Sequence, residues 1–513
     1  MTETRSRVTN PLPLLQDRLI LNHFFCRLFG FDDFNGLRDL LRHTKRGVDE
    51  EGHSHFYHVL RTVEGLDVSH DILAEYDLRI TEYVQQLNRL RSRPVQLLYF
   101  QYLAALFTEI YLARIFTDRD DFLAEINDFI ESENERLPPK APRYEHFTDQ
   151  DLNKIAFWMA TGSGKTLIAH INLWQYLHHS QGEVQHDNVL LITPNEGLSR
   201  QHLQEMAKSG IPAKHYGEAG GTLLSYSRTP VTVIEITKLT ETKRGGGLRV
   251  EVDAFGPRNL LLVDEGHRGA TGEQWRDLRD QLAEQGFTFE YSATFGQIVN
   301  GAAKSKRSQL LELYSRAILF DYSYPHFYYD GYGKDYWILN LRDKTNAFNQ
   351  WMLLGNLISF SEQRLVYDDG QEGFRPFNIE PPLWVFVGHS VTGTKSKDDR
   401  SSLTDVEHIV AFFSDFLENP SRWIERIDRV LNHQTGLRNA LGEDLFQNQF
   451  PYLRGTGLTP KGLYDEIVKR GLRAAPGDRL RVVELKAAPG EIGLRAGADN
   501  PYFGVVNIGD VRG

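Results

Sequence analysis

The chain has 513 residues, 41% of them hydrophobic, which is enough for about three domains with sizeable cores. Its single cysteine, Cys26, excludes an internal disulfide or a cysteine-rich zinc site and fits a reducing, cytoplasmic compartment. The first residues lead into no apolar segment and no run of about 18 apolar residues follows, so we expect neither a secretion signal nor a membrane span. The net charge of −11 excludes a protein that coats nucleic acid through its overall field and leaves only a local groove.

Residues 1–145 are predicted to form a helical accessory domain. Apolar side chains recur there at helical spacing, in 19–28, 37–41 and 95–116. Three prolines between 138 and 142 interrupt this pattern among charged residues. We therefore expect a domain boundary near residue 145.

From residue 146 onward, short apolar strands alternate with helical stretches. This alternation is typical of a doubly wound, parallel α/β sheet, and we place one such lobe at 146–320. In such a sheet the functional residues lie at the carboxyl ends of the strands. The predicted strands are 154–159, 188–193, 231–237, 259–263 and 287–291.

A phosphate-binding loop follows the first of these strands. Glycines at 162 and 164 allow the tight turn in which backbone N–H groups face a polyphosphate, at the amino end of a helix. Lys165 would reach the β- and γ-phosphates, and Thr166 would offer its hydroxyl to Mg²⁺. No Asn-Lys-x-Asp segment that would read guanine occurs, so the expected cofactors are ATP and Mg²⁺. The predicted nucleotide-binding residues of the loop are Thr161, Gly162, Ser163, Gly164, Lys165 and Thr166.

Two carboxylates end the apolar strand 260–263. Asp264 is placed to hold Mg²⁺, and Glu265 is placed to orient and deprotonate the water that attacks the γ-phosphate. Adjacent carboxylates at the end of an apolar strand are rare without a cation to neutralise them. The next strand ends in Ser292-Ala293-Thr294, which completes a set of three elements at neighbouring strand tips.

The phosphate loop, the Asp264-Glu265 pair and the Ser-Ala-Thr segment, in this order and spacing, resemble the motifs of superfamily 2 DExH-type helicases and translocases. More narrowly, 159–166, 264–269 and Tyr-Gly-Lys-Asp-Tyr at 332–336 are similar to the helicase (Res) subunit of type III restriction enzymes. The resemblance covers residues 155–340 and, more weakly, 380–513. It implies RecA-like lobes and ATP-driven movement on DNA. It also implies a role in restriction or phage defence, with partner subunits.

The resemblance also implies roles for single residues near the nucleotide. Ser292 and Thr294 would couple the ATP site to movement of the nucleic acid, and His267 would link the two sites. Gln101 is the candidate for the family's adenine-reading glutamine, although it stands unusually far upstream of the loop. An exposed helical glutamine is the alternative interpretation of Gln101.

Two further segments resemble those that contact the phosphates of a nucleic-acid strand. The first is Thr193-Pro194-Asn195 and the second contains Thr237 and Lys238. Each offers hydroxyl, amide or cationic groups at one edge of the sheet, which suits a phosphate backbone. Ordinary N-caps of the following helices are the alternative.

The remainder of the chain is expected to hold an aromatic and helical connector, 321–380, and a partial second RecA-like lobe, 381–513, that begins with a strand at 383–387. We find no Gln-x-x-Gly-Arg-x-x-Arg segment, whose arginines reach the γ-phosphate in the family. Hydrolysis by this chain alone is therefore expected to be slow. The arginines that could replace the segment are Arg268, Arg307 and Arg481.

Three weaker patterns are assigned to structure and not to catalysis. His53, His55 and His58 are interpreted as solvated histidines because their spacing suits neither a metal nor an HD nuclease site. Glu484, near Lys486, lacks a convincing second acid for a nuclease. The aromatic run 322–337 is interpreted as packing.

The sequence as a whole favours an ATP- and Mg²⁺-dependent DNA helicase or translocase. The alternative is an ATP-dependent switch or scaffold that binds a partner protein without moving on nucleic acid.

Overall fold

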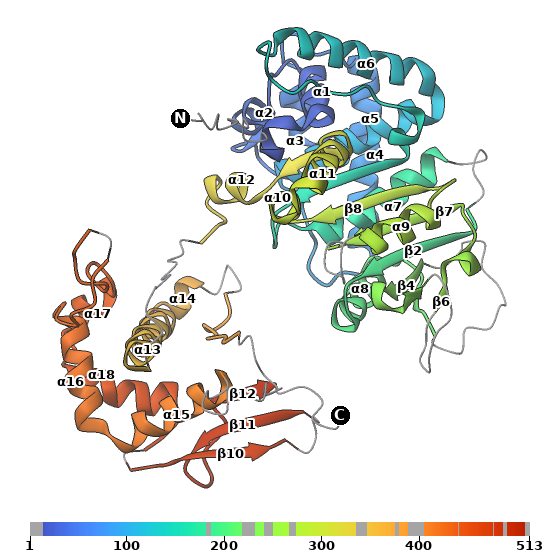
Figure 1. Cartoon of the computed structure of the whole chain (residues 1–513). Helices are drawn as coiled ribbons and strands as arrows, with labels where there is room; N and C mark the ends of the chain where they lie inside the picture. The colour runs from blue at the N-terminus through green and yellow to red at the C-terminus, as the bar shows by residue number, and fades with distance from the viewer. Residues whose placement is uncertain are drawn as a thin grey trace, which may run out of the picture. The chain divides into compact units, whose positions relative to one another are not determined.

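The computed structural model describes residues 14–180, 186–217, 231–240, 250–265, 273–334, 346–374, 379–387, 405–439, 441–475, 477–485 and 490–507. They belong to two compact units, Met1–Tyr336 and Trp337–Gly513 (Figure 1). Within these ranges, no helix has both the length and the hydropathy needed to cross a membrane.

The first unit begins with a helical region, as predicted. Its central helix α5 is buried on nearly all sides, as a helix that is apolar all round must be, and it contacts α4, α6, α7 and β9. One hydrophobic core extends from α1 through α5 to the strands of the sheet, so the helices and the sheet share an interior. The helices are α1 (Ile20–Leu28), α2 (Phe34–Leu41), α3 (His55–Leu60), α4 (His70–Asn88), α5 (Tyr99–Thr117) and α6 (Arg119–Arg136).

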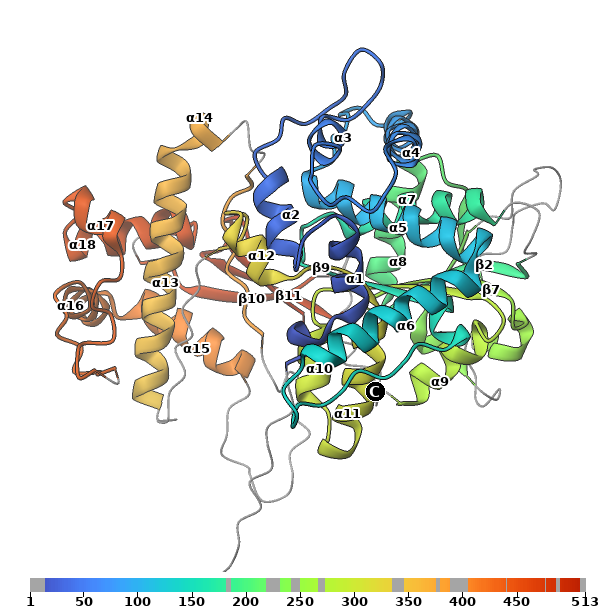
Figure 2. The same cartoon turned by 90° about the horizontal axis from the view of Figure 1, so that it is seen from above.

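A seven-stranded, all-parallel sheet follows, with the strand order β3-β4-β2-β7-β8-β1-β9. Its inner strands are continuous apolar runs because helices cover both faces. Figure 2 shows α1 beside the edge strand β9, which it contacts. All five predicted strands are present. The strands are β1 (Lys154–Met159), β2 (Asn188–Thr193), β3 (Ala213–His215), β4 (Val231–Glu235), β7 (Asn259–Asp264), β8 (Phe287–Ser292) and β9 (Ile318–Tyr322).

Helices alternate with these strands and complete the predicted α/β, RecA-like fold. The predicted strand 231–237 ends two residues earlier than expected. Its counterpart β4 stops at Glu235, and a 3-10 turn, Ile236–Lys238, follows it. A short parallel pair, β5 (Leu239–Thr240) and β6 (Val250–Glu251), lies next in the chain. The helices are α7 (Lys165–His179), α8 (Glu196–Lys208), α9 (Glu273–Leu282), α10 (Phe295–Gly301), α11 (Lys304–Ala317) and α12 (Tyr324–Tyr329).

The second unit has its own core of aromatic and aliphatic side chains around Trp423. Its sheet is antiparallel, with the order β10-β11-β12, formed by Leu480–Glu484, Glu491–Ala496 and Gly504–Asn507. The helices that the structure describes in this unit precede the sheet in the chain. They are α13 (Asn346–Asp369), α14 (Gln371–Phe374), α15 (Asp405–Glu418), α16 (Pro420–Leu431), α17 (Pro451–Thr456) and α18 (Pro460–Glu466).

The strand expected at 383–387 is not formed, and the parts of the second unit that the structure describes contain no parallel sheet of a second RecA-like lobe. Residues 379–387 run without regular secondary structure. Trp384 and Phe386 pack on the core of this unit, whereas Leu383 and Val387 are 83% and 92% exposed. The apolar run therefore buries one face only, where a central strand of a parallel sheet would bury both.

Candidate nucleotide and nucleic-acid site

The phosphate loop lies between β1 and α7, as predicted. Gly162 and Gly164 have φ angles of 87° and 93°, in the left-handed region that favours glycine. The Ser163 hydroxyl donates to the Ala160 carbonyl at 2.7 Å, and the Ala160 N–H donates to the Tyr322 carbonyl at 2.9 Å. The loop is thus fixed both to itself and to the neighbouring strand β9.

Gln101 contacts this loop directly, although it belongs to the first turn of α5. Its Nε2 donates to the Ser163 carbonyl at 2.8 Å, and its Oε1 accepts from the Leu98 N–H at 2.9 Å. A Cβ on Gly164 would lie 2.4 Å from Gln101 Nε2. Gln101 is buried, so it is not the exposed helical side chain of the alternative interpretation. Its role towards adenine stays a prediction.

Lys165 opens α7 and faces the acid pair. Its Nζ lies 3.2 Å from Glu265 Oε1 and donates to the Met159 carbonyl at 3.3 Å. Glu265 has a φ of 50°, an uncommon conformation for a residue with a side chain, and such strain clusters at functional sites. The half-buried Thr166 follows in the first turn of α7. The strand order has therefore brought the loop and the acid pair together.

The Ser-Ala-Thr element touches the same acid pair from β8. The Ser292 hydroxyl donates to Glu265 Oε2 at 3.3 Å and accepts from the Thr294 N–H at 3.1 Å. The Glu265 N–H in turn donates to the Tyr291 carbonyl at 2.9 Å. A continuous set of contacts thus joins Lys165, Glu265, Ser292 and Thr294 across three strand tips.

Asp264 has a partner that the sequence did not reveal. His202 Nε2 lies 2.8 Å from Asp264 Oδ2, and His202 is 5% exposed. His202 belongs to the buried face of α8 together with Ser199 and Met206, a spacing of three and four residues. That spacing was the available signal, because it directs a histidine towards the sheet close to the strand tips.

Thr193, Pro194 and Asn195 lie at the tip of β2. The Thr193 side chain is 1% exposed, and its hydroxyl is 2.7 Å from the Ser199 hydroxyl. Asn195 is exposed, and its Oδ1 accepts from the Leu198 N–H at 3.0 Å, which caps α8. Asn195 is therefore an N-cap, as the alternative to a phosphate contact expected. Asn195 is nevertheless exposed and Pro194 is half-buried.

Lys238 and Thr237 lie in the turn after β4. Lys238 Nζ is 2.5 Å from Glu235 Oε2, and His215 Nε2 is 2.6 Å from Glu235 Oε1. Burial opposes ionisation of Glu235, but Lys238 and then His215 outweigh it and lower its pKa to about 2. The charge of Lys238 is thus matched by a buried carboxylate, whereas Thr237 is exposed.

Several predicted residues lie elsewhere. His267 and Arg268 fall outside the residues that the structure describes, as does Lys486. Arg307 belongs to α11, where it donates to Asn300 Oδ1 at 2.9 Å. Arg481 belongs to β10 of the second unit.

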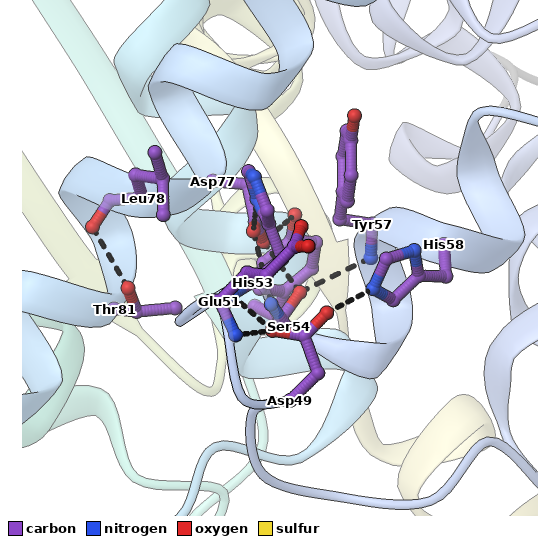
Figure 3. A network of polar contacts seen from close by, with 10 residues as sticks. Asp49, Glu51, His53, Ser54, Tyr57, His58, Asp77, Leu78 and Thr81 are labelled. Carbon is purple, nitrogen blue, oxygen red and sulfur yellow. Dashed lines mark hydrogen bonds and ion pairs between the residues drawn. The ribbon is translucent and has the colours of Figure 1, made fainter.

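The histidines near residue 55 correct one expectation. His53 Nδ1 lies 2.9 Å from Asp77 Oδ2, and His58 Nε2 lies 2.6 Å from Asp49 Oδ2, so these two are paired and not simply solvated (Figure 3). Fully buried Asp77 also accepts from Ser54 and Tyr102. No group of three metal-ligating side chains occurs in the described ranges. This network therefore joins α3, α4 and α5 structurally.

The interpretation of the aromatic run as packing is confirmed at its start, whereas Tyr324, Tyr328, Tyr329 and Tyr332 are exposed. Tyr322 stacks on Phe100 with ring centroids 3.7 Å apart, and its hydroxyl donates to Asp330 Oδ2 at 2.6 Å. Phe327, on α12, comes close to the loop, since its Cζ lies 3.8 Å from where a Cβ on Gly162 would stand.

The donor set at the strand tips fits a magnesium nucleotide. The glycines leave the loop backbone open to phosphate, and the ammonium of Lys165 is the matching cation. The Thr166 hydroxyl and the Asp264 carboxylate are oxygen ligands of the type that Mg²⁺ takes. The parallel sheet with this loop after β1 and an acid pair after β7 defines a RecA-like P-loop fold.

Comparison with known proteins shows one similarity to a protein family, over part of the chain. Residues 120–297 match the model of the family described as type III restriction enzyme, res subunit. The predicted resemblance to proteins of this type is thereby confirmed over that segment.

Solved structures add a distant similarity. Ten chains of solved structures match, one of them from the crystal structure of T4 UvsW, with 15% identity and a TM-score of 0.24. This match takes in 52% of the present chain and 56% of the other, so the chain spans little more than half the length of T4 UvsW. No curated protein matches the chain.

Proposed function

We propose that this chain is an ATP- and Mg²⁺-dependent helicase or translocase that acts on DNA, in a restriction or phage-defence system with partner subunits. The observation that carries the proposal is the contact series Lys165–Glu265–Ser292–Thr294. It links the residues proposed to bind and hydrolyse ATP to the element that couples hydrolysis to movement in the family.

The nucleotide end of the site supplies positioning and charge. The loop N–H groups and Lys165 would hold the β- and γ-phosphates, while Thr166 and Asp264 would hold Mg²⁺. The metal ion, when bound, neutralises charge that develops on the phosphates. Glu265 would orient the attacking water and take its proton. Because Glu265 also accepts from Ser292, a change in its contacts on hydrolysis would reach the Ser-Ala-Thr element.

The nucleic-acid end of the site is proposed at the tips of β2 and β4. Exposed Asn195 and Thr237 offer an amide and a hydroxyl at the same edge of the sheet as the phosphate loop. The pairing of Lys238 with Glu235 limits the positive charge there. With a net charge of −11 for the chain, binding should be local and sensitive to salt.

The test is the affinity for DNA with and without a non-hydrolysable ATP analogue, followed by ATP turnover with and without DNA. We expect the analogue to change DNA affinity, and we expect DNA to raise only slightly a turnover that is slow because the sequence has no Gln-x-x-Gly-Arg-x-x-Arg segment. Lys165→Ala should abolish both effects, and Lys208→Ala, an exposed lysine of the same unit, should abolish neither. ATP binding without any effect on DNA would overturn the translocase and favour the switch or scaffold.

A further inference from the structure

His202 is buried against the carboxylate of Asp264, which precedes Glu265 at the tip of β7. Its Nε2 lies 2.8 Å from Asp264 Oδ2, so Nε2–H is the donor and the carboxylate accepts. The side chains of His202 and Asp264 are 6% and 13% exposed. A donor held this way fixes both the rotamer of the carboxylate and the direction of its remaining lone pairs.

The other buried histidine–aspartate pair of this unit has a different character. Asp77 is 0% exposed and accepts from His53, Tyr102 and both the N–H and hydroxyl of Ser54, so its oxygens are used inside the protein. Asp264 instead lies at a strand tip and keeps partial exposure beside Glu265. The His202 contact therefore restrains a carboxylate that can still take a ligand.

The helix that carries His202 also begins at the proposed nucleic-acid edge. Asn195 caps α8, and the hydroxyl of Thr193 bonds that of Ser199 one turn before His202. The helix capped by exposed Asn195 is thus hydrogen-bonded to Thr193 of β2 through Ser199 and to Asp264 of β7 through His202.

We propose that His202 is a positioning residue that orients Asp264 for Mg²⁺ and ties this carboxylate to α8. The inference rests on the proposed function, because it takes Asp264 as a ligand of the magnesium nucleotide. It adds a connection between the metal site and the helix capped by Asn195, separate from the route through Ser292.

The experiment measures binding of a fluorescent ATP analogue to the full chain during a Mg²⁺ titration and, separately, in EDTA. His202→Ala should weaken the apparent Mg²⁺ affinity by about 10–100-fold, the usual effect of losing a partner of a metal ligand. Its affinity for the analogue in EDTA should stay that of the parent. His202→Gln, which can place an amide N–H near the position of Nε2, should restore part of the Mg²⁺ affinity.

His53→Ala is the matched control, since it removes a buried histidine from an aspartate in the same unit, away from the strand tips. It should leave the Mg²⁺ dependence unchanged. An unchanged Mg²⁺ dependence in folded His202→Ala would overturn the positioning role. Equal weakening in Mg²⁺ and in EDTA would overturn it as well, because it would show a general structural effect. Failure of the parent chain to bind the analogue at all would instead overturn the proposed function.

Discussion

Lys165 Nζ lies 3.2 Å from Glu265 Oε1, and this ion pair joins the phosphate loop after β1 to the strand tip of β7. The two side chains are 12% and 15% exposed, so each is poorly solvated and depends on the other. The residue proposed to bind phosphate and the residue proposed to activate water are therefore in direct contact, and their removal should have different effects.

Glu265→Gln should retain nucleotide binding but lose turnover by about 10²–10⁴-fold, because an amide can orient water but cannot take its proton. Lys165→Ala should instead lose binding, since it removes the cation proposed to hold the phosphates. Equilibrium binding of a fluorescent ATP analogue and single-turnover hydrolysis separate the two effects. Equal loss of affinity in both variants would contradict the separate roles.

Gly164→Ala should disturb the loop more than Gly162→Ala does, although both glycines have a positive φ. A Cβ on Gly164 would lie 2.4 Å from Gln101 Nε2, whereas a Cβ on Gly162 would meet only Phe327, at 3.8 Å. Left-handed backbone costs each alanine about 1–2 kcal/mol, and the first variant adds a collision. Urea unfolding of the single variants measures the difference in stability.

Gln101→Ala provides the control for this collision. It should reduce the extra cost of Gly164→Ala in the double variant, and it should not change the cost of Gly162→Ala. Strictly additive free energies of unfolding for Gln101→Ala and Gly164→Ala would show that the two residues are not coupled.

The local part of this site could be predicted from the sequence, because its signals are contiguous. The apolar run 260–263 predicts a strand, and the residues that follow it are then placed at the strand tip. The same signal was wrong for 383–387, since an apolar run does not say whether a neighbouring strand exists to pair with it. Strand pairing is a tertiary property.

The partners of the predicted residues could not be predicted, for the same reason. Gln101 and Ser163 are 62 positions apart, as are His202 and Asp264. The spacing on α8 directs His202 towards the sheet but does not identify Asp264 as its partner, and each contact depends on how a helix packs on the sheet. The pairing of Lys238 with Glu235 is local in the sequence. How strongly it neutralises Lys238 depends on the burial of Glu235, and Glu235 is buried because it ends a buried strand.

Glu235→Gln and Lys238→Met should shift DNA binding in opposite directions. The first removes the carboxylate that neutralises Lys238, whereas the second removes the ammonium and leaves the carboxylate with His215 near the proposed phosphate contacts. The slope of log K against log salt should steepen by up to about 0.9 in Glu235→Gln and flatten in Lys238→Met. Fluorescence anisotropy with duplex DNA at several salt concentrations gives the slopes. Identical slopes for both variants would remove Lys238 from the proposed interface.

His170 should make the stability of the first unit depend on pH. It is fully buried on α7, with Nδ1 2.9 Å from the Ser209 hydroxyl, and burial lowers its pKa from 6.5 to about 3. Below pH 6.5 the unfolded chain binds a proton at this imidazole and the folded chain does not, so acid favours unfolding. Above pH 6.5 neither state is protonated and the effect vanishes. Between pH 6 and 4 the free energy of unfolding should fall, through His170 alone, by close to about 1.4 kcal/mol per pH unit.

His170→Asn keeps a polar group facing Ser209 but has no proton to bind, so it is the variant that isolates this contribution. Its free energy of unfolding should fall less steeply with decreasing pH than that of the parent. Below pH 6 the difference between the two slopes should correspond to one proton taken up per molecule on unfolding. The other histidines with lowered pKa values, His23, His178 and His186, are present in both proteins and cancel in the comparison. Urea unfolding at pH 7, 6 and 5 is the measurement. Parallel pH profiles for the two proteins would show that His170 is protonated as readily in the folded chain as in the unfolded one.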